Sequence, residues 1–222
     1  MKNKICSYLL AVSAFILILT FSIGLPIYFR PFYYAHIDPL DLEIMSGYEK
    51  NEIVAAYNEV LDYLTLPGTE FGTGVMEYSE EGYSHFEDCK GLFTLNGMAL
   101  FSSAGILLVL FILRKKNLID KLNINGISPI FYSGVAAIVI PSLLGFIIAL
   151  DFDQAFEVFH KIFFPGKDNW LFDPARDEII TVLPEEFFRN CAILIGASVL
   201  ILGALSIILS LSKRKRELKA YK

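Results

Sequence analysis

Four long runs of apolar residues constrain this chain more than any other feature of its sequence. They cover approximately residues 5–27, 95–113, 127–150 and 191–211, and none contains Asp, Glu, Lys, Arg or His. Each run is long enough to cross the hydrocarbon core of a bilayer, which is about 30 Å thick. The sequence therefore predicts an all-α integral membrane protein in which residues 1–222 form a single membrane domain with four transmembrane helices.

The first run follows a basic start, as the apolar region of a signal peptide does. It is longer than such a region, however, and no small-x-small cleavage pattern follows it. We therefore expect an uncleaved first helix.

Positive charge is concentrated in three short segments that flank the runs. Residues 1–4, 114–126 and 212–222 hold twelve of the 19 Lys and Arg residues but only two of the 24 acidic ones. Such an excess in short loops marks the cytoplasmic side of a membrane. We therefore expect both termini in the cytoplasm of a bacterial cell membrane, and residues 28–92 and 151–186 outside it. Juxtamembrane basic residues are typical of contacts with phospholipid headgroups, so membrane phospholipid is an expected partner and nucleic acid is not.

We expect the two outer segments to form an extracytoplasmic cap of short amphipathic or interfacial helices, and the first segment supplies part of it. Apolar residues recur at helical spacing from Ile53 to Leu64, and Pro67-Gly68 ends the pattern. We expect a short hairpin around residues 75–79. Ser84 and Glu87 then fit a capping box that opens the helix of the second span.

The second outer segment predicts a helix with two faces. An aromatic stripe at spacings of four, three and four lies beside a polar stripe, as suits a helix at the level of the lipid headgroups. The aromatic stripe is Phe152, Phe156, Phe159 and Phe163, and the polar stripe is Asp153, Glu157 and His160. Further along, Asp173-Pro174 predicts the N-cap and first residue of another short helix.

Chemistry is expected at the outer surface, because the runs contain no Asp, Glu, Lys, Arg or His. His85 precedes Asp88 by three residues, and His160 follows Glu157 by three. That spacing places each pair on one helix face, where a carboxylate can fix the tautomer of the imidazole. His85 and His160 are therefore candidate catalytic residues with Asp88 and Glu157 as orienting groups, whereas His36 has no patterned neighbours.

Other chemistries are less well supported by the pattern. A di-iron site needs a second Glu-x-x-His arm, which the chain lacks, while a zinc site built from His85, Asp88 and His160 stays an alternative. Cys89 has no histidine at a recognisable pairing spacing, so we interpret it as incidental. A disulfide between Cys89 and Cys191 is left open.

The two outer segments carry a resemblance to a known family. The segments His85-Phe86-Glu87-Asp88-Cys89-Lys90, Phe156-Glu157-Val158-Phe159-His160-Lys161-Ile162-Phe163-Phe164, Asp168-Asn169-Trp170-Leu171-Phe172-Asp173-Pro174, Asp177 and Leu183-Pro184-Glu185-Glu186-Phe187-Phe188 are similar to those of the bacterial lipoprotein intramolecular transacylases. The layout of four spans with short basic inner loops resembles that family too. The family more often has an aliphatic residue at the position of Cys89.

The resemblance implies an acyltransferase of the cell membrane. Such an enzyme moves the sn-2 acyl chain of an S-diacylglyceryl group to the α-amine of the N-terminal cysteine, giving a lyso-form lipoprotein. His85 and His160 match the family's two histidines, and the substrate-binding residues that we expect are Trp170, Asp173, Arg176 and Asp177. No cofactor and no metal are expected, and the partner is the diacylglyceryl-modified N-terminus of a lipoprotein.

Two alternatives come from other functional classes. A non-catalytic membrane sensor or assembly partner would tolerate alanine at both histidines. A zinc-dependent membrane hydrolase would lose activity to chelators. The sequence leaves the lipoprotein clients, the oligomeric state and the identity of the catalytic base open.

Overall fold

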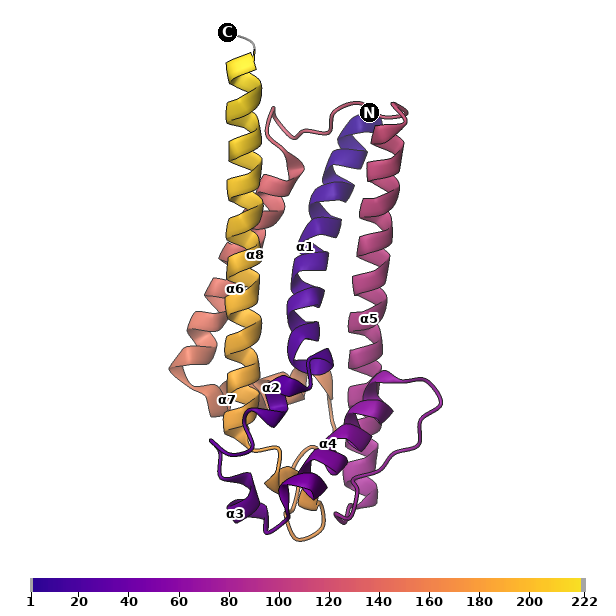
Figure 1. The fold of residues 1–222 in the computed structure, drawn as a ribbon, viewed down its shortest axis with the longest axis vertical. Helices are drawn as coiled ribbons and strands as arrows, with labels where there is room; N and C mark the ends of the chain where they lie inside the picture. Colours follow the sequence, from indigo (N-terminus) through magenta and orange to yellow (C-terminus); the bar gives the residue numbers. More distant parts are fainter. Residues whose placement is uncertain (1, 221–222) are drawn as a thin grey trace. The chain divides into compact units, whose positions relative to one another are not determined.

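The computed structural model describes residues 2–220, without the side chains of residues 2, 147, 149, 217 and 220. Its elements in chain order are α1 (Lys2–Tyr28), α2 (Pro31–Tyr34), α3 (Leu42–Ser46), α4 (Lys50–Thr65), α5 (Glu80–Lys115), α6 (Pro129–Leu150), α7 (Phe152–Phe163), the 3₁₀ helix η1 (Glu178–Thr181) and α8 (Glu185–Ala220). No strand occurs among these described residues. In Figure 1, α1, α5, α6 and α8 are the long helices. Each of these four is long and apolar enough to cross a membrane, which confirms the predicted all-α fold.

The chain divides into two compact units. Unit 1 comprises residues 1–23, 97–146 and 194–222, and unit 2 comprises residues 24–96 and 147–193.

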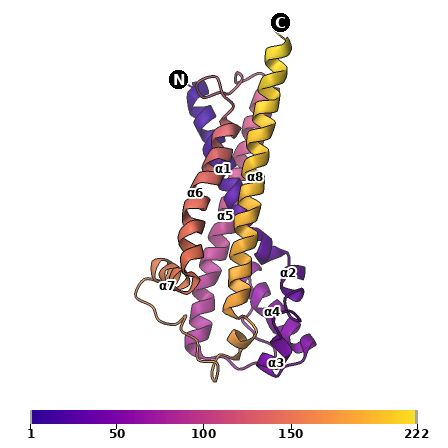
Figure 2. The same ribbon diagram turned by 90° about the vertical axis from the view of Figure 1, so that its left-hand side faces the viewer.

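Unit 1 is a bundle of the long helices. In Figure 2, α6 and α8 run beside each other. Their backbones approach closely at Gly134 and Gly203. A Cβ added to Gly134 would lie 2.7 Å from the carbonyl oxygen of Gly203. Helix α1 packs on both partners, because Ile18 forms a buried cluster with Ala137 and Val199. Small residues at such crossings let helices pack closely where lipid removes the hydrophobic drive for association.

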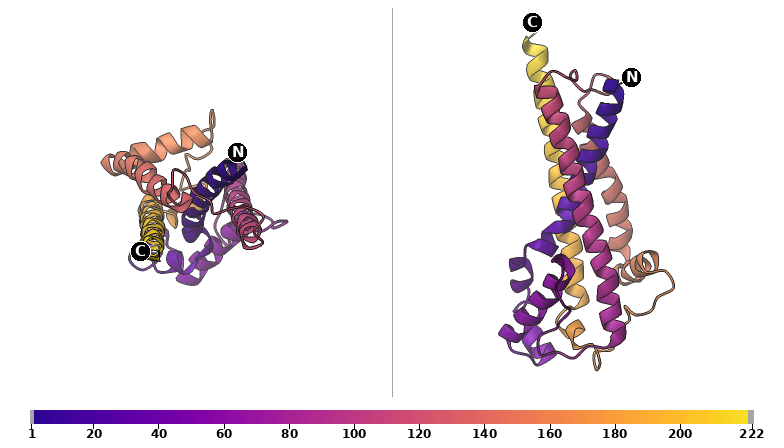
Figure 3. Two further views of the ribbon diagram at one scale, coloured as in Figure 1. Left: turned by 90° about the horizontal axis from the view of Figure 1, so that it is seen from above. Right: turned by 90° about the vertical axis from the view of Figure 1, so that its right-hand side faces the viewer.

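The basic segments gather at one end of unit 1. Figure 3 shows the start of α1, the loop between α5 and α6 and the end of α8 at the same end of the bundle. The side-chain amide of Asn3 donates a hydrogen bond to Asp120, which links α1 to that loop. This grouping agrees with the charge pattern from which the topology was predicted.

Unit 2 has an aromatic core centred on α4. Tyr33 stacks on Tyr57 with ring centroids 3.7 Å apart, and its hydroxyl donates to the carbonyl oxygen of Val182 at 2.8 Å. Phe86 of α5 and Phe187 of α8 are buried in the same cluster. The core therefore joins helices that lie far apart in the sequence.

The predicted helix ending at Pro67-Gly68 is confirmed, because α4 ends at Thr65 and buries Ile53, Tyr57 and Leu64. The predicted hairpin is wrong: residues 75–79 form a turn followed by residues without regular secondary structure.

The start of α5 also differs from the prediction. The helix begins at Glu80, so Ser84 lies inside it and is not an N-cap. Ser79 takes that place, since its Oγ accepts a hydrogen bond from the amide of Gly82 at 3.0 Å. Ser79 is in turn held by the carboxylate of Asp177, which accepts hydrogen bonds from its amide and its hydroxyl.

The segment after Asp173-Pro174 is a turn instead of the predicted helix. The side chain of Asp173 accepts a hydrogen bond from the amide of Ala175 at 3.0 Å, and the helical residues begin only at Glu178, in η1. Asp173 therefore caps a turn, as aspartate commonly does.

Candidate active site

The two candidate histidines lie side by side in unit 2. The ring centroids of His85, on α5, and His160, on α7, are 5.7 Å apart, with an angle of 33° between the ring planes. Each residue is only 7% exposed. The structure thus brings together two side chains that are 75 residues apart in the sequence.

Aromatic rings enclose the pair. Phe164 and Phe172 meet the His85 ring edge-on, at centroid distances of 5.0 and 5.4 Å. Trp170 stacks on the His160 ring at 4.6 Å. Little water can reach a site built in this way, so electrostatic interactions inside it are stronger than in bulk solvent.

The position of His85 depends on how α5 begins. The buried carboxylate of Asp177 accepts hydrogen bonds from the amide of Ser79 at 2.8 Å and from its hydroxyl at 2.9 Å. Gly82 is needed at this point, because an added Cβ would lie 2.9 Å from Cγ of Asp177 and closer still to one carboxylate oxygen. Asp177 therefore fixes the first turn of the helix that carries His85.

His160 is held by the backbone of its own helix. Asp151 caps α7 by accepting a hydrogen bond from the amide of Gln154 at 2.9 Å. Nδ1 of His160 lies 2.7 Å from the carbonyl oxygen of Phe156. A carbonyl only accepts, so in the neutral ring Nδ1 carries the proton and Nε2 keeps its lone pair.

Glu157, which we expect to orient His160, forms an ion pair with another residue in the structure. Its carboxylate pairs with Lys161, one turn along α7, and both side chains are exposed. Helical spacing alone favoured a contact with His160, but a lysine four residues on competes for the same carboxylate. Phe156, whose ring centroid is 4.3 Å from that of His160, is the closer neighbour.

Asp88, which we expect to orient His85, forms its hydrogen bonds with two other residues. It accepts hydrogen bonds from Nζ of Lys167 at 2.5 Å and from the amide of Asn169 at 3.1 Å. Nδ1 of His85 is buried and has no hydrogen-bond partner among the described residues. Asp88 therefore ties the loop after α7 to α5, and acts on His85 only as a nearby charge.

That loop is shaped by a tight turn. Pro165 and Gly166 occupy its central positions, Gly166 has φ of 74°, and the amide of Lys167 donates to the carbonyl oxygen of Phe164 at 3.1 Å. These are the features of a type II turn, which requires positive φ at its third residue. The turn returns the chain so that Trp170 reaches His160, and its indole Nε1 donates to the carbonyl oxygen of Lys167 at 3.0 Å.

The structure corrects the prediction that Cys89 has no histidine partner. Its sulfur lies 3.4 Å from Nε2 of His85, one helical turn earlier. All three cysteines in the described part of the chain are free, so Cys89 and Cys191 do not form a disulfide here.

The four residues predicted to bind substrate are only partly near the histidines. Trp170 contacts His160 directly, whereas Asp173 caps its turn and Asp177 is bonded to Ser79. Arg176 is exposed and pairs with Glu81 at 3.2 Å. His36, given no role, has Nδ1 2.6 Å from the carbonyl oxygen of Phe32.

Burial sets the charge state of the site. It lowers the pKa of His160 from the ordinary value of 6.5, and the hydrogen bond to the Phe156 carbonyl opposes that shift only in part. A neutral imidazole with a free lone pair is the form that accepts a proton.

Within the described residues, no group of three His, Cys, Asp or Glu side chains gathers as a set of metal ligands.

Sequence reasoning missed Lys167, Asn169, Phe164 and Phe172. The Pro165-Gly166 pair was a usable signal, because it marks a turn that brings the following polar residues back toward α7. Nothing in the local pattern pointed to Asp88 as the partner of Lys167, 79 residues away.

The comparisons with known proteins agree with this geometry. The family model described as lipoprotein intramolecular transacylase Lit matches residues 8–188. A search of curated proteins found no match. The solved structure of the membrane integral lipoprotein intramolecular transacylase Lit from Bacillus cereus is similar, with a TM-score of 0.85 and 27% identity over 97% of this chain and 98% of that one.

A second structure of the Bacillus cereus protein, with an H85A mutation, is similar at a TM-score of 0.79 and 26% identity, over 97% of this chain and 96% of that one. Since the family model spans most of the sequence, the chain belongs to the lipoprotein intramolecular transacylase family.

Proposed function

We propose that His85 and His160 are the acid/base pair with which this transacylase moves the sn-2 acyl chain of an S-diacylglyceryl group to the α-amine of the N-terminal cysteine. The product is a lyso-form lipoprotein. The observation that carries the proposal is the 5.7 Å separation of the two buried rings. At that separation, one amine and one ester can contact both imidazoles through hydrogen bonds of roughly 3 Å.

The chemistry needs one proton to change places. The amine nitrogen attacks the ester carbonyl carbon, the bond from that carbon to the glyceryl oxygen breaks, and an amide and a free hydroxyl form. An α-amine has a pKa near 8, so its ammonium form first releases one proton to solvent. The neutral amine that attacks loses a second proton as the amide forms, and the leaving alkoxide gains that proton. An imidazole suits both steps, and no covalent intermediate with the enzyme is needed. The nucleophile and the ester belong to one substrate, so the enzyme contributes chiefly their orientation.

The two rings are assigned different roles. His160 donates through Nδ1 to the Phe156 carbonyl, which leaves Nε2 as the acceptor for the amine proton. Its lowered pKa keeps it neutral near pH 7. His85, with Nε2 beside the Cys89 sulfur and Nδ1 unpaired, stabilises the oxyanion or protonates the alkoxide.

Two buried polar atoms support a polar substrate in this place. Nδ1 of His85 and Oδ1 of Asn169 have no hydrogen-bond partner within the described part of the chain. A buried polar atom without a partner is costly, so such atoms commonly face a ligand or water. Asn169 is anchored to Asp88 and to Ser84, both on the same helix as His85. We assign its amide oxygen to a hydrogen bond from the substrate amine.

The outward face of α7 suits an acyl chain. Phe159, Ile162 and Phe163 are exposed, at 45%, 66% and 49%, while His160 on the other face is buried. An amphipathic helix of this kind lies at the boundary between headgroups and acyl chains. Membrane phospholipid is therefore the expected surrounding of the site, and Arg176 and Asp173 are assigned only to its polar rim.

The protein is integral to a membrane, and we assign it to the bacterial cell membrane with the histidines on the extracytoplasmic face. A reporter that is active only in the cytoplasm should work at the C-terminus or within residues 114–126. It should fail beside Gly82 or Asp168. Activity at Gly82 would reverse the topology and the side of the site.

Neither alternative raised by the sequence is favoured by the family match. A sensor or assembly partner would leave lipoprotein N-termini unchanged, and a zinc hydrolase would release a free fatty acid.

A labelled substrate tests the transfer itself. Purified enzyme is given a synthetic diacylglyceryl lipopeptide with a deuterated sn-2 chain, mixed with an unlabelled lipopeptide of different peptide mass. Mass spectrometry should find the label on the amine of its own peptide only. Label on the other peptide would refute intramolecular transfer, and label retained at the glyceryl group would refute the assignment of the sn-2 chain.

A further inference from the structure

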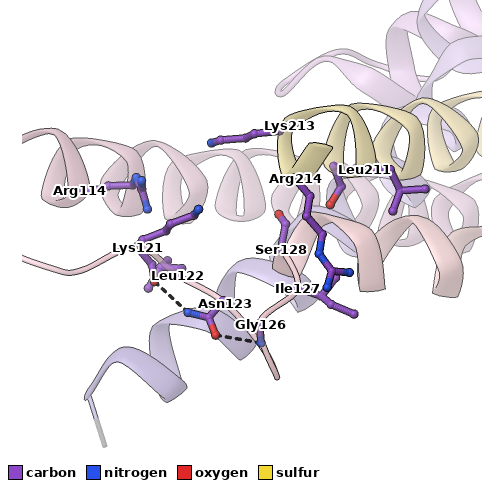
Figure 4. A pocket seen from close by; sticks show the side chains of 11 residues that line it. Arg114, Lys121, Leu122, Asn123, Gly126, Ile127, Ser128, Leu211, Lys213 and Arg214 are labelled. Carbon is purple, nitrogen blue, oxygen red and sulfur yellow. Dashed lines mark hydrogen bonds between the residues drawn. The ribbon is translucent and has the colours of Figure 1, made fainter. Parts of the chain in front are cut away.

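A cationic cavity lies at the basic end of unit 1, and none of the residues assigned to catalysis lines it. Its volume is about 80 Å³, and four basic side chains line it. They come from three segments: Arg114 near the end of α5, Lys121 in the loop before α6, and Lys213 and Arg214 in the C-terminal part of α8. Figure 4 shows these side chains around the loop that connects α5 to α6.

The loop wall of the cavity is held in shape by its own hydrogen bonds. The side chain of Asn123 accepts from the amide of Gly126 at 3.2 Å and donates to the carbonyl oxygen of Lys121 at 3.3 Å. Gly126 has φ of 78°, which a residue with a side chain rarely adopts. Ser128, which precedes α6, places a further polar group on the lining.

Among the described residues of this lining, the side chains are basic, polar or apolar, and none is acidic. Within the described residues, Arg114, Lys213 and Arg214 form no ion pair. The loop acid, Asp120, accepts a hydrogen bond from Asn3 instead. Converging cations repel one another, so an anion in the cavity lowers the electrostatic energy of the folded protein.

We propose that this cavity binds the phosphate group of an anionic phospholipid. Guanidinium groups bind phosphate oxygens through paired hydrogen bonds, and lysines add charge. The volume equals that of about two or three water molecules, which suits a phosphate and excludes a nucleotide. Ile127 and Leu211 add apolar lining, and α5, α6 and α8, which border the cavity, are apolar enough to cross a membrane. A headgroup bound here keeps its acyl chains along such helices, which a soluble phosphate cannot do.

The chain offers a matched pair of variants for the test. Lys213→Gln/Arg214→Gln removes two lining charges, and Lys215→Gln/Arg216→Gln removes the next two from the same helix, which do not line the cavity. Both variants lose the same net charge, so a general attraction to an anionic surface affects them equally. Neither pair belongs to the residues assigned to catalysis.

The measurement is lipid binding to the purified full-length protein in neutral detergent. Native mass spectrometry and thermal unfolding follow titration with phosphatidylglycerol, phosphatidylcholine or inorganic phosphate. We expect one tightly retained phosphatidylglycerol on the wild type and on the control variant. The lining variant should bind it roughly thirtyfold more weakly, from the usual contribution of two basic residues near an anionic headgroup.

Three results would overturn the proposal. Equal retention of phosphatidylglycerol and phosphatidylcholine would remove the requirement for an anion. An equal loss of phosphatidylglycerol binding in the control variant would mean that the basic end attracts anionic lipid in general and that the cavity is not a specific site. Stabilisation by inorganic phosphate that matches that by phosphatidylglycerol, and is lost in the lining variant, would assign the cavity to a soluble anion.

Discussion

Replacing Gly82 by alanine should destabilise the protein sharply, although alanine is the better helix former. The added Cβ would lie 2.9 Å from Cγ of Asp177 and closer still to its Oδ1. Asp177 is only 4% exposed and is bonded to Ser79, so a movement away from the added methyl group would lengthen or break those hydrogen bonds.

The magnitude follows from the bonds that are released. A hydrogen bond to a charged group contributes about 1.5 to 3 kcal/mol, and Asp177 accepts from both the amide and the hydroxyl of Ser79. The higher helix propensity of alanine returns about 1 kcal/mol. The net loss of about 2 to 5 kcal/mol corresponds to a fall of about 4 to 20 °C in the unfolding temperature for a chain of this size.

The assay is thermal unfolding in detergent, with Gly91→Ala as the matched control. Gly91 lies on the same helix, and no heavy atom lies within 4 Å of an added Cβ there. The control should therefore unfold at or slightly above the wild-type temperature. If Gly82→Ala behaves like Gly91→Ala, Asp177 does not fix the start of α5, and its carboxylate is available to bind substrate.

Three further predictions concern the site. Cys89→Ala should keep substantial transacylase activity, because the proposed transfer needs no acyl-thioester; an acyl group trapped on Cys89 would replace it with a two-step route. Asn169→Ala should lower kcat/KM roughly two- to tenfold through one lost hydrogen bond, and an unchanged rate would remove its assigned role. The lowered pKa of His160 should make the wild type gain stability as the pH rises toward about 6.5, because below that value the unfolded imidazole still holds a proton that the folded one has lost. His160→Asn should weaken that dependence, and an identical pH profile would contradict the shift.

The fold was predictable from the sequence because lipid imposes a strong pattern. Uncharged runs of sufficient length form membrane-spanning helices whatever their partners, and α4 followed from its own apolar spacing. The start of α5 was not predictable in this way. Locally, the N-cap could be Ser84, with Glu87, or Ser79, with Gly82. The structure uses Ser79, which is bonded to Asp177, 98 residues away.

The site was predictable in its histidines and not in their neighbours. His85 and His160 stood out because few residues carry such chemistry near a membrane surface. The orienting roles of Asp88 and Glu157 stay predictions, and the groups that they contact were not predictable. Spacing along one helix shows which side chains share a face, but not which lysine pairs with a carboxylate. Lys167 reaches Asp88 only after the chain has turned back at Gly166.

The central claim is that both imidazoles act in one transfer. The most direct test compares purified wild type, His85→Ala, His160→Ala and the double variant on one diacylglyceryl lipopeptide, with lyso-form product counted by mass spectrometry and folding checked by thermal unfolding. Each single variant should remain folded and lose about 10²- to 10⁴-fold in rate. The double variant should lose little more, because residues that act as a unit are not additive. Product at the wild-type rate from the folded double variant would contradict the account.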